Sequence, residues 1–245
     1  MGVDMRSGLR KLPVALAIVG SIAASGRPPA QENVARQRDG RIAIGDKDFG
    51  YFKSDARWPS LADGTTVIFV CWELPGGEQE AERGWVRAAV TDAWERHSKL
   101  RFRGWGTCAA RSSGLRIAVA DDGPDDGPHT TGLGRALDGQ QRGMLLNFTF
   151  RTWSPSCAAD EKSRKSCIES IAVHEFGHAL GFAHEQNRPD KPGECLQPAQ
   201  GESGSTLLTP YDPSSVMNYC NSAYNNSGVL SDLDIVSVQA AYGRP

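Results

Sequence analysis

The sequence predicts one folded domain of the α/β or α+β class, preceded by a short processed N-terminus. Apolar runs of strand type alternate with amphipathic helical segments, and no internal repeat or obvious linker divides the 245 residues. Hydrophobic residues make up 39% and charged residues 23% of the chain, which is close to globular averages and excludes a disordered or multi-span membrane protein. The formal net charge of -2 does not indicate a nucleic-acid or acidic-membrane partner.

The N-terminus has the order of a secretory signal peptide. Basic residues up to Lys11 are followed by an apolar run from Leu12 to Ala24 and by small residues. The run is shorter than the about 20 residues that a membrane-spanning helix needs. We therefore predict a signal peptide over residues 1–26 and secretion, with a buried N-terminal helix or short anchor as the alternative. Residues 27–56 are polar and are predicted as a short propeptide, which leaves 57–245 for the folded domain.

The first half of this domain is predicted to alternate strand and helix. Thr65 to Trp72 is a β-branched, apolar run that is typical of a fully buried strand. From Glu80 to Ser98, apolar residues recur four apart on one face, so a helix is expected there. Three further strands are expected over Leu100 to Trp105, Leu115 to Ala120 and Met144 to Phe150.

A segment rich in Gly, Pro and Asp, Asp121 to Gly143, separates the last two expected strands. Its acidic run, Asp121 to Asp126, could hold calcium, but turns use the same residue types for backbone reasons, and we interpret it as a surface loop. A helix is then expected from about Ser166 to Phe182, followed by a long Pro- and Gly-rich stretch. Ser231 is the expected N-cap of a short C-terminal helix.

Six cysteines, an even number in a chain predicted to be exported, indicate disulfide bonds. Six thiols can pair in many ways, and the sequence alone does not choose among them. Proximity favours Cys157–Cys167 as a local loop closure, after which Cys71–Cys108 and Cys195–Cys220 would follow by elimination. A Cys-ligated zinc site is disfavoured because the sequence has no CxxC-type pair.

Three of the five histidines fall within one motif of the form HExxHxxGxxH. On a helix, residues four apart lie on nearly the same face, so His174 and His178 can present two imidazoles to one Zn²⁺. Glu175 is rotated by about 100° from His174, which places it beside the metal rather than on it. From there it can accept a proton from a metal-activated water.

The third histidine can reach the same ion only if the helix stops. His184 lies ten residues after His174, which is about 15 Å along a continued helix. Gly181 supplies a residue that can take a positive φ at a helix end and let the chain reverse. The motif therefore predicts a zinc site with His174, His178 and His184 as ligands and a fourth position open for water.

These residues resemble the metzincin metallopeptidases, and within them the astacin family. His184 to Asp190 is similar to the astacin continuation HEQxRxD, and Ser215 to Tyr219 resembles the family's Met-turn, SxMxY. The resemblance implies that Met217 lies beneath the metal site, and that Tyr219 ligates zinc at rest and later hydrogen-bonds the oxyanion. It also implies an α+β fold with an α/β-type N-terminal subdomain, in which a twisted, mostly parallel sheet lies over the active-site helix, and a smaller irregular C-terminal subdomain ending in a helix.

Weaker similarities extend toward the N-terminus. Arg57 to Pro59 resembles the start of mature astacins, and Gly132 to Arg135 resembles their segment before the cleft strand. In that family the mature N-terminus pairs with the Glu after the third histidine, here Glu185. Ile44 to Asp46 resembles the end of the propeptide motif FxGD, whose Asp caps the zinc in the zymogen. Ala43 stands where the Phe would be, and an ordinary Gly-Asp turn is the alternative.

The hypothesis that results is a secreted zinc endopeptidase, monomeric, with an extended polypeptide as substrate and no nucleic-acid or membrane partner. Glu175 is the expected general base, and Tyr219 is expected to stabilise the oxyanion together with zinc. We expect the substrate to pair with an edge strand above the active-site helix, assigned to Met144 to Phe150. Two alternatives stay open: a matrixin-like metzincin that requires calcium, and a secreted zinc protein without catalysis.

Overall fold

The computed structural model describes residues 35–36, 42–43, 50–74 and 77–245. The predicted signal peptide, residues 1–26, and the propeptide similarity at Ile44 to Asp46 lie outside the described residues. Within the predicted propeptide, two short strands, β1 (Ala35–Arg36) and β2 (Ile42–Ala43), pair antiparallel.

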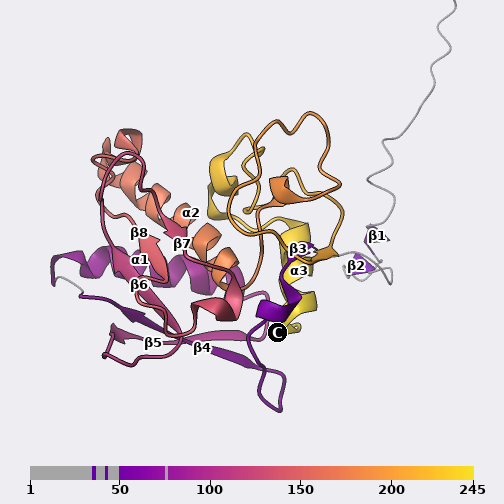
Figure 1. Cartoon of the computed structure of the whole chain (residues 1–245), viewed down its shortest axis with the longest axis horizontal. Helices are drawn as coiled ribbons and strands as arrows, with labels where there is room; N and C mark the ends of the chain where they lie inside the picture. Colours follow the sequence, from indigo (N-terminus) through magenta and orange to yellow (C-terminus); the bar gives the residue numbers. More distant parts are fainter. Residues whose placement is uncertain (1–34, 37–41, 44–49, 75–76) are drawn as a thin grey trace, which may run out of the picture.

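A mostly parallel, five-stranded sheet forms the centre of the N-terminal half (Figure 1). Its order is β5-β4-β6-β8-β7, and every neighbouring pair is parallel except β7 with β8. One face of the sheet is buried: on β4, Ile68 and Val70 are almost fully buried, whereas Phe69 between them is 57% exposed. The strands are β4 (Thr66–Trp72), β5 (Leu100–Thr107), β6 (Leu115–Val119), β7 (His129–Thr130) and β8 (Met144–Leu146).

Three of the predicted strands are confirmed to within two residues. The fourth, expected over Met144 to Phe150, is shorter than predicted and does not lie at the edge of the sheet. β8 ends at Leu146 because the Asn147 side-chain Oδ1 accepts hydrogen bonds from the N–H groups of Thr149 (2.9 Å) and Phe150 (2.8 Å), which turns the chain. β8 also has neighbours on both sides, β6 and β7, so it is an interior strand and not the expected edge strand. The edge on that side is β7, which lies in the segment expected to be only loop.

Two helices, α1 and α2, complete the core together with the buried face of the sheet. α1 (Glu80–Val90) continues as a π-helical segment to Glu95, which accounts for most of the helix expected up to Ser98. α2 (Glu161–Ala179) begins five residues before the expected start, because the Asp160 carboxylate caps it by accepting a hydrogen bond from the Ser163 N–H at 2.7 Å. Its first turn is charged and exposed, so apolar periodicity could not reveal it.

The C-terminal half is irregular and ends in α3 (Asp232–Tyr242) (Figure 1). Ser231 is confirmed as its N-cap: the Ser231 Oγ accepts a hydrogen bond from the Asp234 N–H at 2.9 Å, and the Asp234 carboxylate accepts one from the Ser231 N–H at 3.0 Å. This reciprocal pair is a capping box. The observed architecture confirms the predicted α+β fold, with a parallel sheet and helices in one half and a smaller irregular half ending in a helix.

Residues 50–56, part of the predicted propeptide, pack into the folded body. β3 (Gly50–Phe52) pairs antiparallel with β9 (Thr206–Leu208), and Phe52 is buried against Phe182 with ring centroids 5.3 Å apart. The Ala183 N–H donates to the Tyr51 carbonyl at 2.8 Å. A processing boundary at residue 56 stays a prediction, but this segment holds the chain that follows α2.

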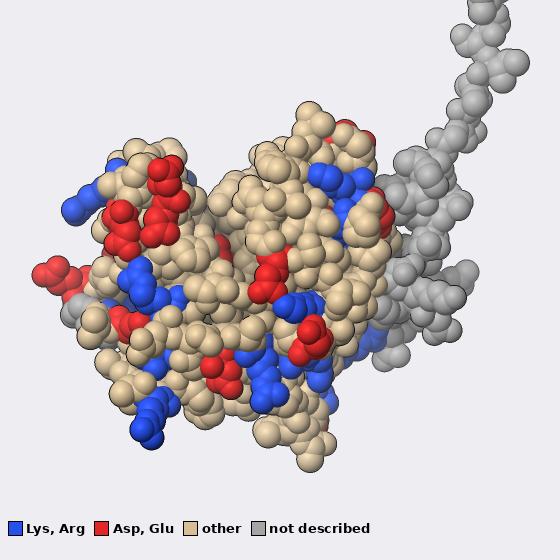
Figure 2. All heavy atoms as spheres, in the orientation of Figure 1, with Lys and Arg blue, Asp and Glu red and all other residues tan. Residues whose placement is uncertain are grey.

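All six cysteines are paired, and the connectivity favoured from the sequence is confirmed: Cys71–Cys108, Cys157–Cys167 and Cys195–Cys220. Bonds of this kind persist in oxidising compartments. In the described part of the chain, no helix has the length and apolar character needed to cross a bilayer. On the face shown in Figure 2, basic and acidic side chains are interspersed.

Candidate metal centre

The helix that carries the first two histidines ends where the motif requires. The Phe182 N–H donates to the Gly177 carbonyl (3.0 Å) and the Gly181 N–H to the His178 carbonyl (2.9 Å), which is the Schellman pattern of a helix end. Gly181 has φ +99°, as predicted. A Cβ at this position would also lie 2.9 Å from the Phe52 ring, so both the turn and the packing require glycine.

The reversal brings three imidazole nitrogens to one point. Nε2 of His184 lies 3.2 Å from Nε2 of His174 and 3.1 Å from Nε2 of His178. Three nitrogens each about 2.0–2.1 Å from a tetrahedral zinc ion would be about 3.3 Å apart. The donor set and its spacing therefore fit zinc. Among the described residues, these three histidines form the one group able to hold a metal ion.

Each histidine is oriented by a backbone carbonyl from a different segment. His174 Nδ1 lies 2.7 Å from the Val216 oxygen, His178 Nδ1 lies 2.8 Å from that of Phe182, and His184 Nδ1 lies 3.0 Å from that of Gln200. A carbonyl can only accept, so each Nδ1 carries the proton and donates. Each Nε2 lone pair is consequently free to bind the ion, as in many metal sites.

Burial sets the protonation of the site. It lowers the pKa of His174 to about 3, assisted by the neighbouring His184, and it also lowers the pKa values of His178 and His184. The neutral ring is the form that binds a metal. Burial alone raises the pKa of Glu175 to about 8, and its Oε2 has no hydrogen-bond partner within the described residues.

The base of the site is Met217, as the family resemblance implies. Met217 is buried, and a Cβ placed on Gly177 would lie 2.4 Å from its sulfur. The glycine between the two helical histidines therefore lets the methionine pack directly under the helix. The sequence analysis did not predict that Gly177 makes room for Met217. The available signal was that glycine, a poor helix former, stands inside the helical part of the motif.

Tyr219 lies against the metal site. Its hydroxyl is 3.5 Å from Nε2 of His174, its ring stacks on that of His174 at 5.3 Å, and its ring centroid is 4.5 Å from that of His184. The Tyr219 N–H donates to the Gln186 side chain at 3.1 Å, which anchors the backbone. The position allows the expected role, and the role itself stays a prediction.

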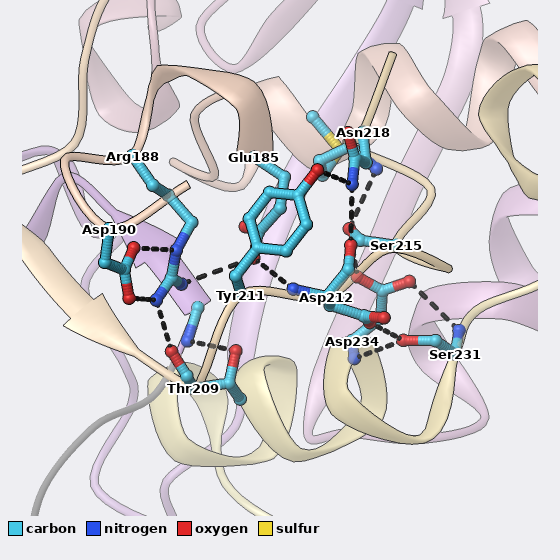
Figure 3. Close-up of polar contacts among 12 residues, drawn as sticks. Glu185, Arg188, Asp190, Thr209, Tyr211, Asp212, Ser215, Asn218, Ser231 and Asp234 are labelled. Carbon is cyan, nitrogen blue, oxygen red and sulfur yellow. Dashed lines mark hydrogen bonds and ion pairs between the residues drawn. The ribbon is translucent and has the colours of Figure 1, made fainter. Parts of the chain in front are cut away.

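A buried polar network supports the chain after the third histidine (Figure 3). The Arg188 guanidinium donates two hydrogen bonds of 2.8 Å to Asp190 and one of 2.7 Å to the Thr209 carbonyl, and it lies 3.3 Å from Glu185. Burial raises the pKa of Glu185 to about 8, against the opposing effect of Arg188. Glu185 and Gly50 line the same small cavity. The predicted pairing of Glu185 with a mature N-terminus stays a prediction.

The same network ties the C-terminal helix to the first ligand. The Asp234 carboxylate accepts hydrogen bonds from the Ser215 hydroxyl (2.7 Å) and from the Val216 N–H (3.0 Å). The carbonyl of Val216 in turn accepts from His174. Asp234, which completes the capping box of α3 and bonds Ser215 (Figure 3), therefore also fixes the backbone that orients His174.

A cleft of about 350 Å³ opens onto His178 and His184. Glu175, Tyr219, β7 with the residues on either side of it, and residues 200–202 also line it. We expected the substrate to pair with an edge strand at Met144 to Phe150. That expectation is wrong, because the edge strand is β7. Gly132 to Arg135 lies between β7 and β8, and so precedes the strand that was expected to bind substrate.

The acidic loop makes structural contacts. The Asp121 carboxylate accepts hydrogen bonds from Asn147 (2.9 Å), from the Thr149 hydroxyl (2.6 Å) and from the Arg151 N–H (2.7 Å). Desolvation acts to raise the pKa of Asp121, but these hydrogen bonds together outweigh it and lower the pKa. Asp122 pairs with Arg142 on the surface. The contacts agree with the interpretation of a surface loop.

Comparisons with known proteins point to one group of zinc proteases. The family profile of Astacin, a peptidase family, matches residues 163–195. High choriolytic enzyme 1 of Oryzias latipes is 39% identical over 75 residues, a match that spans 26% of this chain and 28% of that protein. The chain thus matches little more than a quarter of that relative's length.

Solved structures extend the similarity to the whole fold. The structure of myroilysin covers 80% of this chain and all of its own, with a TM-score of 0.55 and 19% identity. The hatching enzyme zinc-protease of Oryzias latipes covers 81% of this chain and all of its own, with a TM-score of 0.52 and 22% identity. The fold is that of these two structures, one of which is described as a zinc-protease. Residues 163–195, which contain the three histidines, are therefore similar to the Astacin profile, and the similarity of fold extends over about 80% of the chain.

Proposed function

We propose that this chain is a secreted zinc endopeptidase that hydrolyses peptide bonds in extended polypeptides and acts as a monomer. His174, His178 and His184 would hold zinc, which lowers the pKa of a water molecule and polarises the scissile carbonyl. The three disulfides suit an extracellular compartment.

In this proposal, two side chains carry the proton and charge movements. Glu175 accepts a proton from the attacking water and passes it to the leaving amine, and its free Oε2 in a buried site suits a base that waits for water. The Tyr219 hydroxyl donates a hydrogen bond to the oxyanion. The substrate lies in the cleft and pairs with the exposed edge of β7.

One observation carries the proposal: the three Nε2 atoms converge beside an open cleft that is lined by two of the histidines and by Glu175, a buried carboxylate whose Oε2 has no hydrogen-bond partner among the described residues. A structural zinc site is closed by a fourth protein ligand and has no use for a base. The same observation weighs against a zinc protein without catalysis. A calcium-requiring metzincin would need acidic groups free for the cation, whereas Asp121 and Asp122 are bonded within their loop.

The variant Glu175→Gln tests the catalytic assignment. It should keep about one zinc per chain and lower peptide hydrolysis by at least about 10²-fold, because it keeps the side-chain shape and removes the base. Zinc content is measured by metal analysis, and cleavage by a mass-resolved digest of casein with and without a zinc chelator. Glu169→Gln, on the exposed side of the same helix, is the matched control and should cut at the parent rate. Parent-like cutting by Glu175→Gln would remove Glu175 as the base.

A further inference from the structure

A second tyrosine lies directly beside Tyr219. The Tyr224 ring stacks on the Tyr219 ring, with centroids 5.9 Å apart and planes 22° apart, and the two phenol groups interact electrostatically. Tyr224 also lies within electrostatic range of Glu175. One half of Tyr224 is exposed, so the ring is at the border between the metal site and solvent.

An unusual backbone places this ring. Asn225, Asn226 and Ser227 follow Tyr224 with φ of 48°, 46° and 52°, and Gly228 continues with φ 77°. Such a left-handed run costs about 1 kcal/mol or more for each residue other than glycine, so neighbouring structure must hold it. Strain of this kind concentrates at functional sites.

Contacts on both sides hold the left-handed turn. The Asn226 side chain donates to the Val229 carbonyl at 2.6 Å and accepts from the Asn221 side chain at 3.2 Å. A Cβ on Gly228 would lie 2.9 Å from Cα of Ser170, so the turn packs against α2, the helix that carries His174. Asn225 is buried at the same junction. The turn therefore fixes Tyr224 relative to the ligand helix.

We propose that Tyr224 is a positioning residue for Tyr219: by stacking on the Tyr219 ring from a turn that is packed against α2, it holds the Tyr219 hydroxyl beside the three-histidine site. The inference rests on the proposed function, in which the Tyr219 hydroxyl stabilises the oxyanion. Gln186 fixes the backbone of Tyr219, and the rings of His174 and His184 lie against its ring. Tyr224 adds a further stacking contact. Without Tyr224, the hydroxyl would spend less time where the oxyanion forms.

A double-mutant cycle of Tyr219→Phe and Tyr224→Phe tests this role. Steady-state cleavage of a peptide chosen from the casein digest gives kcat and KM for each protein. We expect Tyr224→Phe to lower kcat about fivefold, because it removes the phenol group that interacts with that of Tyr219, with KM changed by less than about twofold. In the Tyr219→Phe background, Tyr224→Phe should have no further effect, because it acts only through Tyr219. Tyr224→Leu, which also removes the stacking, should lower kcat more.

A second readout does not need catalysis. In the metal-free protein, the NMR ring signals of Tyr219, assigned through Tyr219→Phe, should shift in Tyr224→Phe and stay in place in the control Val229→Ala, whose exposed side chain lies in the same loop. Val229→Ala should also keep the parent kcat and KM.

The outcomes separate this inference from the proposed function. Multiplicative losses in the double variant, or Tyr219 signals that do not respond to Tyr224→Phe, would overturn the role of Tyr224 in an otherwise active peptidase. A zinc-loaded parent that cuts no peptide would overturn the proposed function, and the catalytic role of Tyr224 with it.

Discussion

Glycines shape this metal centre as directly as histidines do. Gly177 leaves room for the Met217 sulfur beneath the helix, and Gly181 lets the chain turn back toward the ion. Neither contributes a side chain to the chemistry. Both act by the absence of a Cβ, which in one case would collide with a side chain and in the other would strain the backbone as well.

Gly181→Ala should separate the third histidine from the other two. The substitution places a Cβ in a left-handed backbone and 2.9 Å from the Phe52 ring, so we expect a loss of about 1–3 kcal/mol in the free energy of unfolding and weaker zinc binding. Urea denaturation and zinc titration against a chelator measure the two effects. Gly193→Ala is the matched control, because its Cβ would meet nothing within 4 Å. Equal behaviour of the two variants would contradict the proposed role of the turn.

Among the elements, the C-terminal helix has a second task at its N-terminus. The capping residue Asp234 binds the Ser231 N–H within its own helix end, and it also binds Ser215 and Val216 of the Met-turn. The Met-turn then orients His174. A helix cap thus connects the last element of the fold to a ligand on α2.

Asp234 should make the stability of the protein depend on pH. Burial, with a smaller effect of Asp212, raises its pKa to about 6, above the about 3.9 of an unfolded chain. A group with a raised pKa contributes fully below the unfolded value and loses that contribution as pH rises through the folded value. We expect the unfolding free energy of the parent, relative to Asp234→Asn, to fall by up to about 3 kcal/mol between pH 4 and 7. Urea denaturation of both proteins across this range measures the difference, and an increase with pH would contradict the assignment.

At the scale of the whole molecule, residues 52–58 and the C-terminal helix α3 both pack against the end of α2. Trp58 donates from its indole nitrogen to the Ala179 carbonyl at 2.8 Å, and the Tyr242 hydroxyl donates to the Leu180 carbonyl at 2.6 Å. Phe52 covers Gly181 from the same side. Two distant segments, residues 52–58 and α3, thereby stabilise the point at which the chain reverses toward His184.

Phe52→Ala tests whether the segment before residue 57 belongs to the stable fold. Phe52 is 3% exposed and contacts the rings of Phe182 and Tyr242, so its removal should cost about 3–4 kcal/mol. Thermal and urea unfolding of the full chain measure the loss. Leu61→Ala, at a position that is 58% exposed, should change stability by less than about 0.5 kcal/mol. If Phe52→Ala left the stability of the full chain unchanged, residues 50–56 would not be part of the stable fold.

Local patterns in the chain were enough to predict the convergence of the three histidines, the helix turn at Gly181 and the cap at Ser231, because each depends on geometry over a few residues. Proximity and elimination also indicated the three disulfides. Folding in three dimensions was needed to establish that β7, rather than Met144 to Phe150, forms the edge of the sheet, and that Tyr224 lies on Tyr219. Strand order and contacts between distant segments depend on long-range packing, which no local spacing in the chain records.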